Sequence, residues 1–125
     1  LFRDLNKGIS ITPLKPTKAL YAFAENHAKT TGKKGKTGHR SVRGNSFETR
    51  TKDLIKKYSL VGENIHYGSN NALEIVIDLL IDDGIKGVGH RVNIMTKDYV
   101  FCSVSIQPHT KYLYNCVIDF AGKKI

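Results

Sequence analysis

The chain has 125 residues, of which 40% are hydrophobic and 25% are charged, and its formal net charge is +9. This length corresponds to one domain, residues 1–125, which can bury enough surface to fold without a disulfide or a metal. No apolar run approaches the ~18 residues of a membrane-spanning helix, and no signal-peptide pattern is present. Because the chain begins at Leu1 rather than methionine, we expect that an upstream segment has been removed.

Residues 1–16 contain two prolines and a glycine and are predicted to form an extended leading segment. Apolar residues then recur at helical spacing over residues 17–32, with Thr17 as the N-cap and Gly32 as the stop. His27 falls on the apolar stripe of this helix. We therefore interpret His27 as a core histidine rather than a ligand.

The stretch "KTTGKKGKTGHRSVR", residues 29–43, contains the letters "GKT" of a phosphate-binding loop. The position five residues before Gly35 is Thr30, where that loop requires a second glycine, so nucleotide binding is excluded. The stretch has no acidic residue and predicts attraction to acidic glycans or lipid headgroups, although a lysine-rich soluble surface explains it equally well. It also has no aromatic residue for base stacking, which disfavours nucleic acid. The candidate polyanion-binding residues are Lys33, Lys34, Lys36, Arg40 and Arg43.

A short helix is predicted next, with Ser46 as its cap and Phe47, Leu54, Ile55 and Tyr58 facing the core.

"LVGENIHYG" alternates as a strand does and places Glu63 on the apolar face, where a carboxylate must find partners. "NNALEIVIDLLIDDG" predicts a helix that is apolar on most sides and therefore largely buried. With Asn71 as its N-cap, Glu74 occupies the capping-box position, which is a structural explanation for that acid.

"KGVGHRVNIM" predicts a glycine-rich loop that presents His90. The runs "YVFCSVSI" and "KYLYNCVIDF", separated by "QPHT", predict an antiparallel hairpin. If Ile106 pairs with Tyr112, then Cys102 and Cys116 lie opposite each other, either as a disulfide or as two buried thiols. The order of elements indicates an α+β domain with helices covering an antiparallel sheet.

Four residues remain as candidates for chemistry: His39, Glu63, Glu74 and His90. Two histidines with two carboxylates suit a divalent metal or acid–base catalysis. The zinc-protease pattern H-E-x-x-H and the hydrolase pattern G-x-S-x-G are both absent.

The segments "TGHRS", "VGENIHYG", "ALEIVIDLL" and "GVGHRVNIM" occur in the order and approximate spacing of the CAP superfamily. This superfamily comprises the cysteine-rich secretory, antigen 5 and pathogenesis-related 1 proteins, and the chain resembles its short bacterial branch. The resemblance covers about residues 17–122. The sequence departs from the family in having Leu79 and Leu80 where an aromatic residue is usual, and in the insertion "DDGIKGV", which lengthens the loop before His90.

The resemblance implies a three-layer α–β–α sandwich with a central antiparallel sheet. It also implies that His39, Glu63, Glu74 and His90 form a cavity tetrad. In this interpretation His39 and His90 weakly bind zinc or another divalent cation, and the two glutamates orient them. It further implies an exported protein of the binding type, secreted or held at the surface through a lipid anchor upstream of this chain, with a sterol or lipid as its apolar ligand.

Two alternatives remain open. In a metal-assisted hydrolase, Glu63 or Glu74 would be the general base, but a third metal ligand is lacking. In a basic adhesin-like module, residues 29–43 would bind acidic glycans or lipid headgroups of a host or membrane. The sequence predicts neither the oligomeric state nor the identity of the ligand.

Overall fold

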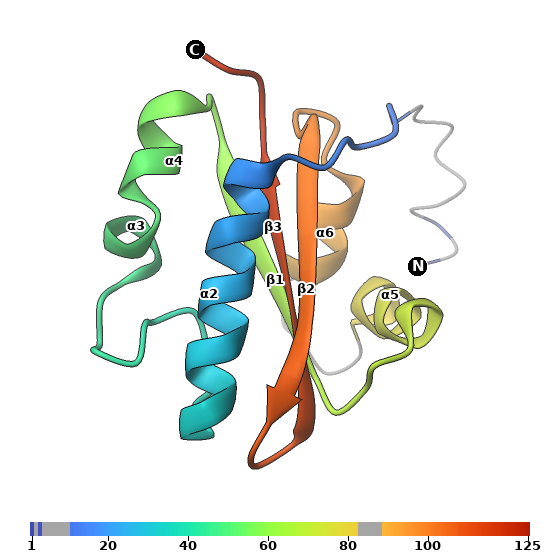
Figure 1. Ribbon diagram of the computed structural model, residues 1–125. Helices are drawn as coiled ribbons and strands as arrows, with labels where there is room; N and C mark the ends of the chain where they lie inside the picture. Colours follow the sequence, from blue (N-terminus) through green and yellow to red (C-terminus); the bar gives the residue numbers. More distant parts are fainter. Residues whose placement is uncertain (2, 4–10, 83–88) are drawn as a thin grey trace.

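The computed structural model describes residues 1, 3, 11–82 and 89–125. Three antiparallel strands form the centre of the molecule, and helices cover both faces of the sheet (Figure 1). The predicted α–β–α sandwich is therefore confirmed. Its elements in chain order are α2 (Lys18–Lys34), α3 (Phe47–Arg50), α4 (Lys52–Lys57), β1 (Val61–Tyr67), α5 (Ala72–Ile81), α6 (Gly89–Met95), β2 (Phe101–His109) and β3 (Leu113–Ala121).

The strand order is β1-β3-β2, so β3 is central and β1 and β2 are edge strands. Alternate residues of β3 face the two helical layers, as the pleat of a strand requires. Val117 packs on the same side as Ala24 and Ala28 of α2. Ile118 belongs to the cluster that contains Ile75 of α5. The sheet thus separates two hydrophobic cores, one under α2 and α4 and one under α5 and α6.

Helix α2 begins as predicted and ends later than predicted. The Thr17 hydroxyl accepts a hydrogen bond from the Leu20 N–H at 3.1 Å, which confirms the cap. The helix passes through the buried Gly32 and ends at Gly35, which has φ of 64°. A glycine inside a helix costs only about 1 kcal/mol. Close packing accounts for Gly32, since its backbone lies against the Pro108 carbonyl group of β2.

The hairpin register differs from the prediction. Ile106 pairs with Cys116 rather than Tyr112, and Cys102 pairs with Phe120. The prediction placed the turn at "QPHT", but β2 continues through Pro108, because an edge strand tolerates proline. The two cysteines are therefore not opposite each other and are free thiols. Burial raises the pKa of the Cys116 thiol to about 11.

Helix α5 is less buried than its composition predicts. Its cap is confirmed, because the Asn71 side chain accepts a hydrogen bond from the Glu74 N–H at 2.9 Å. Only Ile75 and Leu79 are buried. Only one side of the helix covers the three-stranded sheet, so Leu80 is half-buried and four further apolar side chains stay exposed: Leu73, Val76, Ile77 and Ile81.

Three further predictions are corrected or limited by the structure. Ile55 of α4 is 41% exposed, whereas Leu54 and Tyr58 are buried, because a helix of six residues presents only one side to the core. His90 lies in the short helix α6 and not in an open loop. The insertion before His90, apart from Asp82, and half of the leading segment, residue 2 and residues 4–10, lie outside the described residues. Of that segment, Lys15 forms a bridge with Phe101.

We predict that Gly32→Ala lowers the free energy of unfolding by about 1–3 kcal/mol despite the better helix propensity of alanine. The added methyl group would collide with the Pro108 carbonyl oxygen. Urea unfolding measures the effect, with Asn26→Ala at an exposed position of the same helix as the control. Equal stability of Gly32→Ala and wild type would contradict the close approach of α2 to β2.

Candidate functional site

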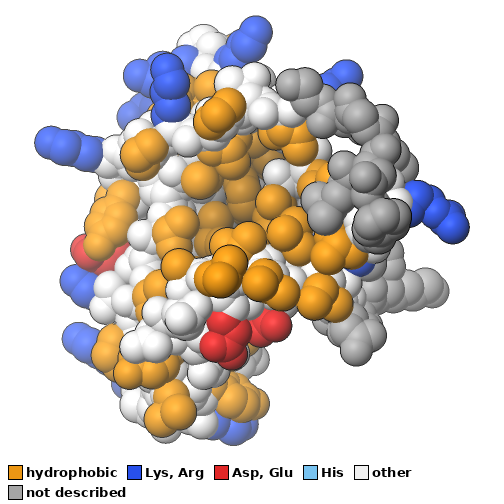
Figure 2. Space-filling model, turned by 90° about the vertical axis from the view of Figure 1, so that its right-hand side faces the viewer, with side chains coloured by type: hydrophobic (Ala, Val, Ile, Leu, Met, Phe, Trp, Pro, Cys, Tyr) orange, Lys and Arg blue, Asp and Glu red, His pale blue; other side chains and the backbone are white. Residues whose placement is uncertain are grey.

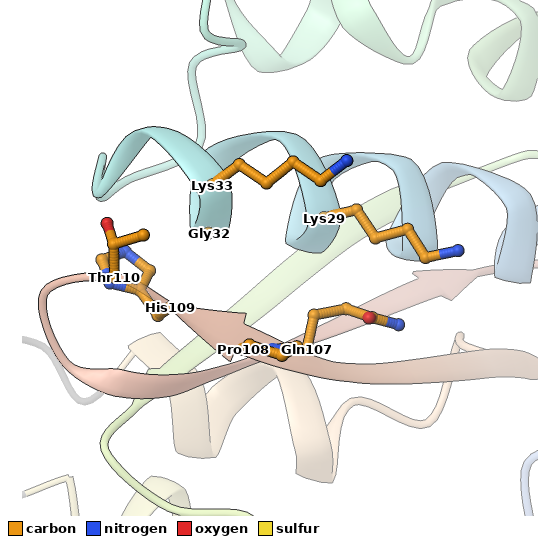
Figure 3. Close-up of a pocket in the computed structure, with 7 residues that line it drawn as sticks. All are labelled: Lys29, Gly32, Lys33, Gln107, Pro108, His109 and Thr110. Atoms are coloured by element: carbon orange, nitrogen blue, oxygen red, sulfur yellow. The ribbon is translucent and has the colours of Figure 1, made fainter.

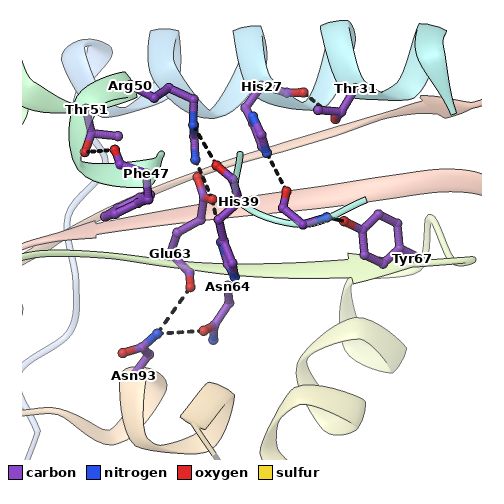
Figure 4. A network of polar contacts seen from close by, with 11 residues as sticks. His27, Thr31, His39, Phe47, Arg50, Thr51, Glu63, Asn64, Tyr67 and Asn93 are labelled. Carbon is purple, nitrogen blue, oxygen red and sulfur yellow. Dashed lines mark hydrogen bonds and ion pairs between the residues drawn. The ribbon is translucent and has the colours of Figure 1, made fainter. Parts of the chain in front are cut away.

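The buried carboxylate of Glu63 lies at the centre of the candidate site. It projects from β1 toward the layer of α2 and α3, and its side chain is only 1% exposed. Arg50 of α3 donates a hydrogen bond through Nη2 to Oε1 of Glu63 at 2.6 Å. Nδ1 of His39 lies 2.8 Å from the same oxygen (Figure 4). The partners that the sequence requires for Glu63 are therefore an arginine and a histidine.

The loop before α3 is held so that His39 reaches Glu63. The His27 ring donates through Nε2 to the Gly38 carbonyl oxygen at 2.8 Å, and the Gly38 N–H donates to the Tyr67 hydroxyl at 2.7 Å (Figure 4). Arg50 also donates through Nε to the His39 carbonyl oxygen at 3.1 Å. Gly38 has φ of 94°, which favours glycine. His27 is thus a buried structural residue, as predicted, and it positions the neighbour of His39.

Asp119 is a site residue that the sequence interpretation missed. It is fully buried on β3 and pairs directly with Glu63 across the ladder. Both Asp119 oxygens and Oε2 of Glu63 lack a hydrogen-bond donor among the described atoms. A proton on Asp119 supplies that donor. The signal was present in the sequence, since Asp119 lies between Val117 and Ala121 on the apolar face of its strand.

The electrostatics place the negative charge on Glu63 and the proton on Asp119. Burial raises the pKa of Asp119 to about 10, helped by the hydrogen bond to Glu63 and by its negative charge. Burial would also raise the pKa of Glu63, but hydrogen bonds from His39, Asp119 and Arg50 outweigh it and hold this pKa at about 2. Two neighbouring carboxyl groups share one proton in this way because two negative charges side by side repel each other.

The second histidine lies on the other side of β1. Nδ1 of His90 lies 2.8 Å from Oδ1 of Asp82, and the His90 N–H donates to Oδ2 of Asp82 at 2.9 Å. Burial would raise the pKa of Asp82, but the bonds from His90 and from the backbone outweigh it, so the pKa lies below its usual range. Asn64 of β1 donates to the His90 carbonyl oxygen at 3.0 Å. Asn93 donates to Oδ1 of Asn64 at 2.8 Å (Figure 4).

The two histidines therefore share one arrangement. Each ring is held through Nδ1 by a buried carboxylate, while the side chains of His39 and His90 are 47% and 28% exposed. Adjacent residues of β1 bind the two histidines. Glu63 binds the His39 ring, and Asn64 donates to the His90 carbonyl oxygen. β1 is an edge strand, so one of its sides has no neighbouring strand among the described residues. A carboxylate on one ring nitrogen orients the other nitrogen as a metal ligand.

Glu74 is not joined to this network. It lies in the first turn of α5, is exposed, and its carboxylate makes no hydrogen bond or ion pair with any residue that the structure describes. Asp82 instead holds His90. Within the same part of the chain, no group of three or more histidine, cysteine or acidic side chains is arranged to hold a metal ion.

The basic residues of the loop are all exposed. Arg40 donates to the Gly44 carbonyl oxygen at 2.9 Å, and Lys36 lies 3.4 Å from the Val42 carbonyl oxygen. These contacts close the loop on itself. The ammonium groups of Lys33 and Lys34 make no ion pair with any described acidic residue.

Comparisons with known proteins agree with this fold. The family model described as the cysteine-rich secretory protein family, CAP, matches residues 5–120, so the chain belongs to this family. An outer surface protein from Borrelia burgdorferi superposes with a TM-score of 0.76 at 18% identity, over 98% of this chain and 86% of that one. An extracellular protein containing an SCP domain from Bacillus anthracis gives a TM-score of 0.70 at 18% identity, over 90% of this chain and 35% of that one. No curated protein sequence matches the chain.

Helices of the described part of the chain are too short or too polar to cross a membrane.

The shared proton predicts a distinctive pH dependence for Asp119→Asn. Native Asp119 keeps a proton that the unfolded chain releases above a pKa of 3.8, so wild-type stability falls as the pH rises from there toward about 10. The asparagine amide donates to Glu63 without a titrating proton. The variant should therefore gain stability relative to wild type with rising pH, with a limiting slope of about 1.4 kcal/mol per pH unit.

Urea unfolding across that pH range measures this difference. Asp119→Ala is the contrasting variant and should lose about 2 kcal/mol or more, because the Glu63 oxygen is left without a donor and a cavity forms. Parallel pH profiles for wild type and Asp119→Asn would show that Asp119 is ionised in the folded protein.

Proposed function

We propose that this chain is an extracytoplasmic binding module that holds a divalent cation, best zinc, between Nε2 of His39 and Nε2 of His90. The observation that supports the proposal is that both rings are held in the same way. A buried carboxylate, Glu63 or Asp82, takes the Nδ1 side of each ring. The other ring nitrogen of each histidine is then available as a ligand on the open side of β1.

The expected site is weak and exchangeable. Structural zinc takes four protein ligands and catalytic zinc takes three, whereas this site offers two imidazoles, so water must complete the coordination. Imidazole binds a metal only when it is neutral, so occupancy should fall on acidification. These properties suit a reversible ligand that is lost and regained, rather than a metal required for folding.

A hydrolytic function is less well supported. A general base must reach a substrate or its attacking water. The Glu63 side chain is 1% exposed, and Arg50 and His39 both occupy Oε1. Glu74 is exposed but has no partner among the described residues that would shift its basicity or orient it. Neither glutamate is therefore placed as a general base, which favours binding over catalysis.

The extracytoplasmic location is supported by the two solved structures with this fold. One is named an outer surface protein and the other an extracellular protein. Family membership agrees with a secreted or surface-held protein. We extend the location to this chain as part of the proposal.

A second candidate function, binding of an apolar ligand such as a lipid or sterol, is favoured by the face that carries α5 and α6. Figure 2 shows hydrophobic side chains gathered around a hollow on this face, with acidic side chains at its border. The exposed hydrophobic side chains of this layer include Leu73 at 70%, Val92 at 53% and Ile77 at 43%. A cluster of this kind is typical of a ligand or partner site.

The cation proposal predicts that zinc binds wild type with one-to-one stoichiometry in calorimetric titration. His39→Ala and His90→Ala should each abolish the measurable heat, and Asp82→Asn should weaken binding by about 10–100-fold. His66→Gln is the control, because its ring pairs with Asp78 at 2.8 Å rather than with Glu63 or Asp82. Identical isotherms for wild type and the His39→Ala, His90→Ala double variant would refute the site.

The apolar-ligand proposal predicts enhanced fluorescence of a dansylated fatty acid in the presence of wild type. Ile77→Asp and Val92→Asp should each reduce the enhancement severalfold. Ile55→Asp introduces the same charge at a side chain of similar exposure, 41%, on the opposite helical layer and should leave the signal unchanged. Equal fluorescence from all four proteins would exclude this face as the ligand site.

A further inference from the structure

The hairpin tip, residues 110–113, exposes a leucine that folding does not explain. Leu113 is 73% exposed and has φ of 74°. It is the central residue of a γ-turn, since the Tyr114 N–H donates to the Tyr112 carbonyl oxygen at 2.9 Å, and a γ-turn with positive φ is rare and strained. A leucine at this position is strained and gains no burial. The exposed side chain and the strained backbone therefore indicate that Leu113 contributes to binding another molecule rather than to folding.

The tip is held by ring contacts and hydrogen bonds, and it presents a second large side chain next to Leu113. Tyr112 is 42% exposed, and its ring lies 5.8 Å from that of Tyr67 and 5.4 Å from that of His109. Nδ1 of His109 accepts hydrogen bonds from the N–H groups of Lys111 and Tyr112, both at 3.1 Å. Its Nε2 then carries the hydrogen and donates to the Lys36 carbonyl oxygen at 2.8 Å. The tip is thus fastened to the loop that follows α2.

Lysines surround the tip because the end of α2 contacts it directly. The Thr110 N–H donates to the Gly32 carbonyl oxygen at 3.0 Å, and Gly35 lies against the Thr110 and Lys111 side chains. This places the exposed ammonium groups of four lysines at one end of the sandwich. None of them forms an ion pair with a described carboxylate: Lys33, Lys34, Lys36 and Lys111.

A pocket of about 440 Å³ opens next to the tip, between α2 and the end of β2 (Figure 3). Lys29 and Lys33 line one side, and Gln107 and the Thr110 hydroxyl line the other. Lys29 forms an ion pair with Glu25 at 3.4 Å. Lys33 is therefore the lysine of this pocket whose charge no described carboxylate compensates. The volume and the cationic and hydrogen-bonding groups suit a phosphate-bearing headgroup.

We propose that the hairpin tip docks this protein on an anionic lipid bilayer. Leu113 enters the headgroup boundary, the Tyr112 ring lies at the interface, and the lysines bind lipid phosphates, one of them in the pocket. Amphipathic aromatic rings favour the membrane interface, and lysines near an anionic leaflet are attracted to it. An acidic glycan would satisfy the lysines equally but would leave Leu113 without a reason to be exposed.

This surface is independent of the proposed cation site. The His39 and His90 rings bond to Glu63 and Asp82, whereas Leu113 and Lys111 belong to the hairpin tip and the other lysines to the end of α2 and the loop after it. The inference therefore goes beyond the proposed function.

The test is flotation with vesicles of phosphatidylcholine alone and vesicles containing about a third phosphatidylglycerol. Wild type should float only with the anionic vesicles, and less so at high salt. Leu113→Gly should reduce affinity about tenfold, because one buried leucine is lost. The same variant should melt at a higher temperature than wild type, because glycine relieves the strained φ. Weaker binding by a more stable protein cannot come from misfolding.

The electrostatic part is tested by Lys33→Gln, Lys34→Gln, Lys111→Gln, which should weaken anionic-vesicle binding on the order of a hundredfold at low salt. The matched control neutralises three exposed lysines of α4, which lies at the opposite end of the sandwich (Figure 1): Lys52, Lys56 and Lys57. It removes the same net charge and should bind nearly as wild type does.

Three results would overturn the proposal. One is the absence of binding to anionic vesicles. Another is an equal loss of binding in the tip and α4 triple variants, which would indicate attraction by net charge alone. The third is heparin binding that exceeds vesicle binding and is unaffected by Leu113→Gly, which would assign the lysines to an acidic glycan.

Discussion

The buried charge of Glu63 is the constraint on which the site depends. An ionised carboxylate inside a sheet layer is stable only if cations and hydrogen-bond donors surround it. Arg50 and His39 meet this demand from one side, and protonated Asp119 meets it from the neighbouring strand. Because Arg50 also binds the His39 backbone, the carboxylate indirectly shapes the loop between α2 and α3. The position of the exposed His39 therefore follows from the burial of Glu63.

Strand β1 contacts both histidines, one on each face of the sheet. Its consecutive residues point to opposite faces, so Glu63 organises the α2 side and Asn64 organises the α6 side. Asn93 contacts both residues, through the Glu63 carbonyl oxygen at 3.3 Å and the Asn64 side chain. An edge strand is suited to this role because its outer side has no neighbouring strand among the described residues. The proposed cation site requires both imidazoles to reach this open edge from different helical layers.

Two features of the surface are not required for folding. One is the apolar side of α5, and the other is the strained Leu113 within a group of lysines. They lie on different parts of the molecule, since α5 covers one face of the sheet and the hairpin tip lies at its end (Figure 1). Under the two proposals, a chain of 125 residues with a net charge of +9 separates a ligand face from a membrane-docking end.

The sequence alone determined the helices and strands other than α6, the caps at Thr17, Ser46 and Asn71, and the need of Glu63 for partners. Such features depend on residues close together in the chain, where periodicity and capping preferences act. Tertiary structure alone decided that Asp82 rather than Glu74 holds His90, that Asp119 lies opposite Glu63, and that the hairpin register differs. These contacts join residues whose distance depends on how elements pack, and no local pattern encodes that distance.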